Sequence, residues 1–335
     1  MDLLADVLAV SGVRGTVAAR IRAGSSWGWW ARDVRGAAFH AVTAGTAWLG
    51  LPGQPPRELL PGDVVLLPTG TEHLLAGDER IAARGGDHRS DSWERAGDGT
   101  VRIGVGPVRT HILCAHYTHD PAVTTQVLGL LPEIVHIRGC PGGTGLDDTV
   151  RLLGRELADP RIGGAVVLDR LVDVLLVQLL RVWLAGAPDR PRTSWLGALG
   201  DPVVAAALRE LHADPARAWT TASLAGVVVV SRATLARRFA AALGQSPGVY
   251  LTRWRMDLAA LRLRDTEESL DVVARSVGYS SVYAFSRAFR RARGAPPGRY
   301  RQTARGSGTG SRRWHGGVEQ GAAGLARRGL VLPPE

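Results

Sequence analysis

A segment of about 20 residues occurs twice in the C-terminal third of the chain, and this repeat limits the possible folds more than any other feature. Residues 231–250 and 281–300 share eight identical positions at a spacing of 50 residues, where ordinary composition would give roughly one or two. The identical pairs are Ser231/Ser281, Arg237/Arg287, Phe239/Phe289, Ala242/Ala292, Gly244/Gly294, Pro247/Pro297, Gly248/Gly298 and Tyr250/Tyr300. Two copies of one structural unit are therefore expected.

Each copy has the pattern of a helix-turn-helix unit. A serine can cap the start of the helix, an apolar pair four residues apart forms its buried face, and a glycine ends it. A shorter helix containing Leu224 or Val273 precedes each cap, and Gly278 supplies a tight turn in the second copy. These positions are Ser231 and Ser281 at the start, Leu235, Phe239, Phe285 and Phe289 on the buried face, and Gly244 and Gly294 at the end.

Arg237 and Arg287 recur at the same place, two residues after the first core residue of each helix. An early, outward position of this kind is where a recognition helix meets base edges in the major groove. The alternative is a pair of solvated arginines that only cover the helix ends. Their recurrence in both copies favours base contact.

Residues 247–265 between the copies are predicted to form an amphipathic helix. Its length of roughly 28 Å is close to the roughly 34 Å of one DNA turn.

The charge distribution also indicates a polyanionic partner for the C-terminal part. The chain contains no lysine, and its 41 basic residues are all arginine. Residues 1–200 contain 20 Arg against 21 Asp plus Glu, and residues 201–335 contain 21 Arg against 10. The whole positive excess therefore lies in the part that carries the repeat, as expected for a domain that binds nucleic acid.

The stretch from Trp219 to Arg301 resembles the DNA-binding domain of AraC/XylS-type transcription regulators. This resemblance implies an all-α domain of two tandem helix-turn-helix units that binds a double-stranded operator, and contacts RNA polymerase if the protein is an activator. Two alanines leave the first unit only Arg237 for hydrogen bonding, and the valine run Val227–Val230 is expected to weaken its first helix. The implied base-facing residues are Ala233, Ala236, Arg237, Val282, Tyr283, Ser286 and Arg287.

The N-terminal part has short apolar stretches separated by Gly, Pro and Asp, which is typical of an all-β unit. Gly62, Pro68, Gly70 and His73 match the second cupin motif, G-x5-P-x-G-x2-H, at every fixed position. The first motif retains only His40 of its metal ligands. Two imidazoles without a carboxylate make a poor transition-metal site, so we predict no metal, no cofactor and no enzymatic activity.

The N-terminal part also resembles the cupin-like sensor domains that precede AraC-type DNA-binding domains, which implies a pocket for a small effector. His40, His73 and Trp29 are the candidate effector-binding residues. The alternative for the two histidines is a hydrogen-bonded place in the core.

A redox sensor is a second possible function for the N-terminal part. Cys114 lies on an apparent strand with His116 on the same face, and an adjacent imidazolium would lower the thiol pKa and favour oxidation. Cys140 is the possible second thiol. An inert buried cysteine is the competing interpretation.

Together these patterns predict an α+β protein with four parts. They are a cupin-type β-barrel with flanking helices (1–115), a helical connector that forms a dimer interface (116–200), the double helix-turn-helix domain (201–303) and a disordered basic tail (304–335). A long surface loop is expected over residues 78–100. The apolar stripe for the dimer consists of Leu168, Leu171, Val172, Leu175, Leu176, Leu179 and Trp183.

The predicted function is a ligand-responsive, homodimeric transcription regulator. A cupin enzyme with a DNA-binding appendage and a nonspecific architectural DNA-binding protein are the competing functions. Two cysteines are too few for a disulfide framework, and charged residues interrupt the longest apolar run. We therefore expect a cytoplasmic protein without a membrane segment.

Overall fold

The computed structural model describes residues 2–32, 34, 36–84, 93–96, 100–118, 128, 131–139, 145–159, 161–186 and 195–308. By residue contacts the chain divides into two compact units. The helical unit comprises Met1–Arg14, Thr118–Pro132 and Leu180–Gly310, and the barrel unit contains Gly15–Tyr117 and Glu133–Leu179. The predicted α+β class, with a sheet-rich part followed by a helical part, is confirmed.

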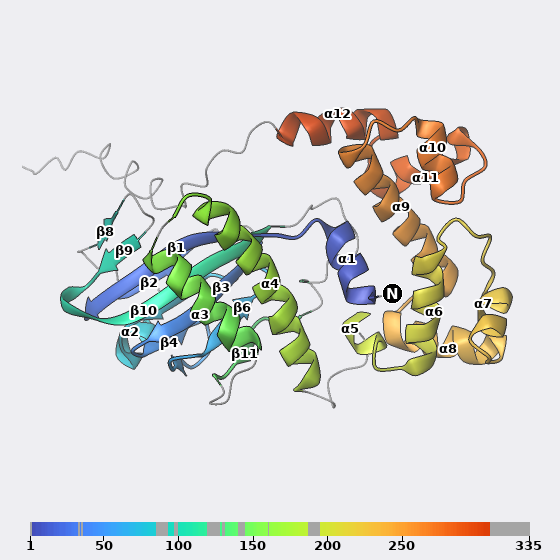
Figure 1. Cartoon of the computed structure of the whole chain (residues 1–335). Helices are drawn as coiled ribbons and strands as arrows, with labels where there is room; N and C mark the ends of the chain where they lie inside the picture. The colour runs from blue at the N-terminus through green and yellow to red at the C-terminus, as the bar shows by residue number, and fades with distance from the viewer. Residues whose placement is uncertain are drawn as a thin grey trace, which may run out of the picture. The chain divides into compact units, whose positions relative to one another are not determined.

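The barrel unit contains two β-sheets (Figure 1). One has seven strands in the order β11-β6-β3-β10-β1-β9-β8, and the other has four in the order β2-β7-β4-β5. The strands are β1 (Arg14–Ser25), β2 (Gly28–Ala31), β3 (Ala37–Ala44), β4 (Ala47–Gly50), β5 (Arg57–Leu59), β6 (Val64–Leu67), β7 (His73–Ala76), β8 (Trp93–Arg95), β9 (Thr100–Ile103), β10 (Val105–Thr118) and β11 (Val135–Ile137).

The core of this unit combines residues of both sheets. Along β1, Ala19, Ile21 and Ala23 are buried in the core, whereas Arg20 and Arg22 between them are only half-buried. This alternation is the two-residue period of a strand with one face inward.

Two residues of the cupin motif segment, Gly70 and Asp63, have a clear structural task. Gly70 has a φ of 67°, and a Cβ atom there would lie 2.0 Å from the carbonyl oxygen of Val34, so only glycine fits this turn. The carboxylate of Asp63 accepts hydrogen bonds from the backbone N–H groups of Leu60 and Gly139 and from Nε2 of His136. Asp63 thereby fastens the turn before β6 to the end of β11.

The segment expected to be a long loop, residues 78–100, contains the helix α2 (Glu79–Arg84) and the strand β8. The prediction was wrong for these two elements, which are too short to show a periodic pattern in the sequence, and residues 85–92 and 97–99 lie outside the described residues. Two longer helices, α3 (Gly145–Ala158) and α4 (Gly164–Ala185), lie over one face of the seven-stranded sheet (Figure 1). The hydroxyl of Tyr117 donates to the carbonyl oxygen of Val172 at 2.9 Å and holds α4 on β10.

The helical unit contains α1, the end of α4 from Leu180 onward, and α5 to α12. Their bounds are α1 (Leu3–Ser11), α5 (Trp195–Ala198), α6 (Pro202–Ala213), α7 (Thr221–Val227), α8 (Arg232–Leu243), α9 (Pro247–Asp265), α10 (Leu270–Ser276), α11 (Val282–Arg293) and α12 (Pro297–Gly308). Helix α9 covers the predicted residues 247–265 and connects the pair α7–α8 to the pair α10–α11 (Figure 1). Helix α12 continues into the segment that we expected to be a tail; residues 309–335 lie outside the described residues.

Helix α1 belongs to the helical unit although it precedes the barrel in the sequence. It packs against α6 and α9, and Leu3, Leu4, Val7 and Val10 are buried. The N-terminal part predicted as residues 1–115 is therefore divided between the two units, because its first helix, α1, belongs to the helical unit. No helix in the described ranges is long and apolar enough to cross a membrane.

The valine run ends helix α7 and forms the turn that follows it. Val230 N–H donates to the carbonyl oxygen of Ala225, and Tyr279 N–H donates to that of Ala274, so the two turns correspond. Their central residues are Val229, with a φ of 55°, and Gly278, with a φ of 81°. A residue other than glycine loses roughly 1–2 kcal/mol in this left-handed conformation, so the first turn is strained.

Replacing Val229 with glycine is expected to stabilise the helical unit by about 0.5–1 kcal/mol. The relief of strain exceeds the extra entropy that glycine gives to the unfolded chain, and little packing is lost because Val229 is 87% exposed. Chemical denaturation monitored by circular dichroism measures the change. The matched control is Val228→Gly, at a φ of −88°, which should give no gain. An equal gain in both variants would show that left-handed strain is not the cause.

Candidate functional site

The first helix-turn-helix unit presents an exposed face of helix α8. Ser231 caps the helix by accepting a hydrogen bond from Thr234 N–H, and Leu235 and Phe239 are fully buried. On the other side, Ala233 and Arg237 are exposed and Ala236 is half-buried. The neighbouring Arg238 differs from Arg237, because it forms an ion pair of 3.4 Å with Asp201, the N-cap of α6.

The second unit presents helix α11 in the same manner. Ser281 caps it, and Phe285 and Phe289 are fully buried. Tyr283 is 73% exposed, Arg287 is exposed, and Val282 and Ser286 are half-buried beside them. The guanidinium carbon of Arg287 lies 5.8 Å from the ring centroid of Tyr283, a cation–π contact that restricts the arginine before any ligand binds.

The repeated aromatic residues support both recognition helices identically. Phe239 and Tyr250 form an edge-to-face contact at 5.7 Å and 75°, and Phe289 and Tyr300 form one at 5.3 Å and 76°. Each contact joins a recognition helix to the helix that follows it. The identities in the repeat therefore belong to the support of the site, except for the exposed arginine pair.

A buried ion pair fixes the second recognition helix but has no counterpart in the repeat. Asp257 of α9 pairs with Arg293 at the end of α11, and their side chains are 0% and 1% exposed. Neither residue was predicted from the sequence. The available signal was an acidic residue on α9 three positions after the buried Trp254, where an apolar residue is expected.

In the barrel unit, His40 and His73 meet inside the core. Their Nε2 atoms are 2.7 Å apart, and the rings come from β3 and β7. Both side chains are buried, and burial lowers the pKa of each, so both are neutral at pH 7. The described part of the chain contains no group of three or more His, Cys, Asp or Glu residues able to hold a metal ion.

The hydrogen bonds define one tautomer for each ring. His73 Nδ1 lies 2.7 Å from the carbonyl oxygen of Thr71, which can only accept, so Nδ1–H donates and Nε2 accepts. His40 Nε2–H must then donate to His73, and His40 Nδ1 accepts from the Cys114 thiol, whose Sγ atom is at 3.1 Å. All four ring nitrogens have partners, as expected for histidines with a hydrogen-bonded place in the core.

Trp29 lies on the inner side of the small sheet. In the pairing of β2 with β7, Trp29 lies opposite Leu75 and Ala31 lies opposite His73, so these four residues share one face. Trp29 is half-buried and packs against the core. The structure thus brings His40 and His73 into direct contact and places Trp29 farther along the same face.

Cys114 has the opposite electrostatic environment to the one expected. It pairs with His40 across β10 and β3, it is buried in the core, and burial raises its thiol pKa to about 12. His116 does not supply the expected imidazolium, because burial also lowers its pKa. The prediction that a charged neighbour activates the Cys114 thiol is therefore wrong. Cys140 lies outside the described residues.

We expect Cys114 to resist thiol reagents in the folded protein. In a Cys140→Ser background, an aromatic disulfide reagent at pH 8 should label less than about one tenth of the thiol within an hour, because thiolate is rare below a pKa of about 12. Complete labelling after unfolding in guanidinium is the control. Rapid labelling of the native chain would show an accessible, acidic thiol.

The comparisons with known proteins agree with both units. Residues 2–185 match the family described as cupin, and residues 224–303 match the helix-turn-helix domain family. An AraC-like transcription regulator of Streptomyces lividans is 38% identical over 307 residues, covering 90% of this chain and 98% of that protein. The transcriptional regulator AlkR of Acinetobacter baylyi is 31% identical over 78% of this chain and 87% of its own length.

Among solved structures, the DNA-binding domain of AdpA in complex with a target DNA is 30% identical, with a TM-score of 0.30, over 32% of this chain and 96% of that one. Both relatives are named as transcription regulators, the class of protein predicted from the sequence. The chain belongs to the AraC family of DNA-binding transcription regulators, with an N-terminal cupin domain.

Proposed function

We propose that the chain recognises a specific operator through two adjacent major grooves, one read by α8 and the other by α11. The observation that carries the proposal is the exposure of Arg237 and Arg287 at the same place on two capped, aromatic-supported helices. Helix α9 between them has 19 residues, a length of roughly 28 Å, which suits grooves one turn apart.

The two units contribute unequally to base reading. Of the three proposed base-facing residues in the first unit, only Arg237 offers hydrogen-bond donors, and Ala233 and Ala236 provide methyl contacts with thymine. In the second, Tyr283, Ser286 and Arg287 offer polar contacts and Val282 an apolar one. We therefore propose that α11 determines most of the sequence preference, with α8 adding affinity and register.

Selection of random DNA fragments by the purified full chain tests this function. One motif of two blocks about 10 base pairs apart should be enriched, and its preference over random DNA should persist at about 200 mM salt, where nonspecific binding falls. Retention of fragments without a shared motif would instead indicate a nonspecific architectural DNA-binding protein.

We also propose that the barrel unit binds a small effector on its inner face. The support is the row of neutral, hydrogen-bonded side chains Cys114, His40 and His73, with Trp29 on the same face. A polar ligand would bind by replacing the hydrogen bonds among these side chains with its own. In a reporter strain, His73→Gln should then abolish the response to the inducing compound and leave operator binding by the purified chain intact. An unaltered response would contradict this site.

A homodimer is proposed through the outer face of α3 and α4, not through the stripe chosen from the sequence. Val172, Leu175 and Leu179 of that stripe are fully buried within the chain. Leu152, Val166, Val167 and Val174 of α3 and α4 instead are 40–66% exposed, and we propose that they form one apolar patch, which is typical of an interface. Val167→Asp should convert the dimer to a monomer in analytical ultracentrifugation. Arg181→Asp, at an exposed position of α4, is the control and should leave the dimer intact.

RNA polymerase is proposed as a further partner if the protein activates transcription.

The geometry of the barrel unit favours neither a redox sensor nor a cupin enzyme. A redox regulator needs a reactive thiol, and Cys114 is buried with a raised pKa. A metal-dependent cupin enzyme needs a metal site, and the two histidines hydrogen-bond to each other with no metal-binding cluster around them among the described residues.

A further inference from the structure

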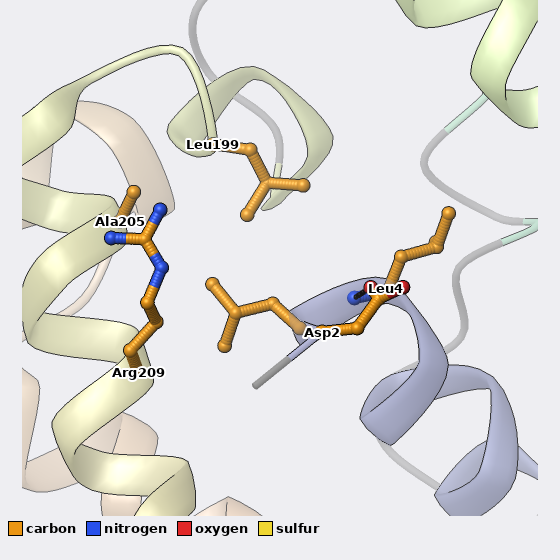
Figure 2. Close-up of a pocket in the computed structure, with 6 residues that line it drawn as sticks. Asp2, Leu4, Leu199, Ala205 and Arg209 are labelled. Atoms are coloured by element: carbon orange, nitrogen blue, oxygen red, sulfur yellow. Dashed lines mark hydrogen bonds between the residues drawn. The ribbon is translucent and has the colours of Figure 1, made fainter.

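Within the helical unit, helix α1 leaves a cleft of about 340 Å³ against α6 and the turn before it. Figure 2 shows Leu199, Ala205 and Arg209 on one side and Asp2 and Leu4 of the α1 segment on the other. The volume is at the lower end of the range for small-molecule sites. Neither operator recognition nor effector binding inside the barrel uses this cleft.

The lining of the cleft is mostly apolar. Leu3, Leu4 and Ala205 are buried, and Leu199 is half-buried at the edge. Two backbone groups of the first turn of α1 are already satisfied, because Oδ1 of Asp2 accepts hydrogen bonds from Leu4 N–H at 3.0 Å and Ala5 N–H at 3.2 Å. An occupant therefore meets mainly aliphatic side chains on this side of the cleft.

One cation adjoins this apolar surface. Arg209 follows Ala205 by one helical turn, so both lie on the same face of α6. Among the described residues no hydrogen bond or ion pair engages its guanidinium group. The neighbouring Asp2 carboxylate is held at its own helix as the cap. A guanidinium group beside aliphatic side chains suits a molecule with a short hydrocarbon chain and one carboxylate, because the carboxylate can pair with the guanidinium while the chain packs on the apolar lining.

We propose that the cleft between α1 and α6 binds a short aliphatic carboxylate, with Arg209 pairing with the carboxylate and Leu3, Leu4, Leu199 and Ala205 enclosing the chain. This site is separate from the inner face of the barrel. Because the ligand would contact both helices, it would hold α1 on α6. Only Gly12 and Val13 separate α1 from β1, the first strand of the barrel.

Calorimetric titration of the full chain with octanoate, and with 1-octanol as the uncharged probe of the same length, tests the proposal. Octanoate should bind about 10-fold or more tightly than octanol, as expected for a charge-assisted hydrogen bond. Arg209→Gln should reduce octanoate binding to the level of octanol. Ala205→Leu should fill the cleft and abolish binding of both probes.

The matched control is Arg253→Gln, an exposed arginine on α9 outside the cleft, which should leave both affinities unchanged. Circular dichroism confirms that each variant is folded. If the unsubstituted chain fails to bind octanoate, or binds octanol equally well, the proposal is overturned. Undiminished octanoate binding in Arg209→Gln would equally contradict it, even if Ala205→Leu does not fold.

Discussion

Replacing Arg287 with alanine should weaken binding to the selected operator by about 1–3 kcal/mol, roughly 5- to 150-fold, and leave binding to random DNA nearly unchanged. The side chain is exposed on α11 and restrained by Tyr283, and its loss removes the donor pair that we propose contacts a base edge. Fluorescence anisotropy with operator and scrambled duplexes measures both quantities. Selection with the variant should also show relaxed preference in one block of the motif.

Arg238→Ala is the control on the other recognition helix. It removes the same charge, but Arg238 is paired with Asp201, and an exposed pair contributes about 0–1 kcal/mol. Operator preference should therefore remain. If Arg287→Ala weakened operator and scrambled DNA by the same factor, the arginine would contact only phosphates, and the assignment of base reading to α11 would be wrong.

Replacing Asp257 with alanine should destabilise the helical unit by about 3–5 kcal/mol, the largest stability loss expected for a single substitution here. The variant removes the Asp257 carboxylate from the Arg293 guanidinium, whose side chain is 1% exposed, and breaking a buried ion pair by removing one partner has a cost of this size. Hydrogen exchange followed by mass spectrometry resolves the effect by segment. Amides of α9 and α11 should lose protection, and those of the barrel strands should keep it.

Two further variants separate the buried charge from general damage. Asp271→Ala breaks the exposed i,i+4 pair with Arg275 and should cost only about 0.3–0.5 kcal/mol. Adding Arg293→Met to Asp257→Ala also removes the buried guanidinium and should recover most of the lost stability. A double variant as unstable as Asp257→Ala would show that packing around Asp257, and not the buried charge, dominates.

Features encoded by a few neighbouring residues could be predicted from the sequence. Asp201 with Pro202 begins α6, Ser231 and Ser281 begin the recognition helices, and Gly244 ends α8 with a φ of 66°. Capping depends on side chains within about three residues of the backbone groups that they satisfy. The bounds of α9, Pro247–Asp265, were also predicted correctly, because local residues mark the start of this helix between the two copies of the repeat.

Features that depend on contacts between distant segments could not be predicted. The register of β3, β7 and β10 is not visible in the sequence, and that register decides that His40 contacts His73 and Cys114. The predicted direction of the Cys114 pKa shift was wrong for this reason, because His116 two residues away was the only visible partner. The apolar residues of α4 were recognised, but only packing distinguishes those that face the sheet from those left exposed.

The most direct test of the central claim is the effect of operator spacing on affinity. Helix α9 is continuous over Pro247–Asp265 and fixes the distance between α8 and α11. Inserting about five base pairs between the two blocks of the selected motif turns the second block to the opposite side of the duplex, about half a helical turn. Affinity should fall about tenfold or more, to the level of a duplex that carries one block alone. Equal affinity for the original and the lengthened operator would contradict reading of adjacent grooves by two rigidly connected helix-turn-helix units.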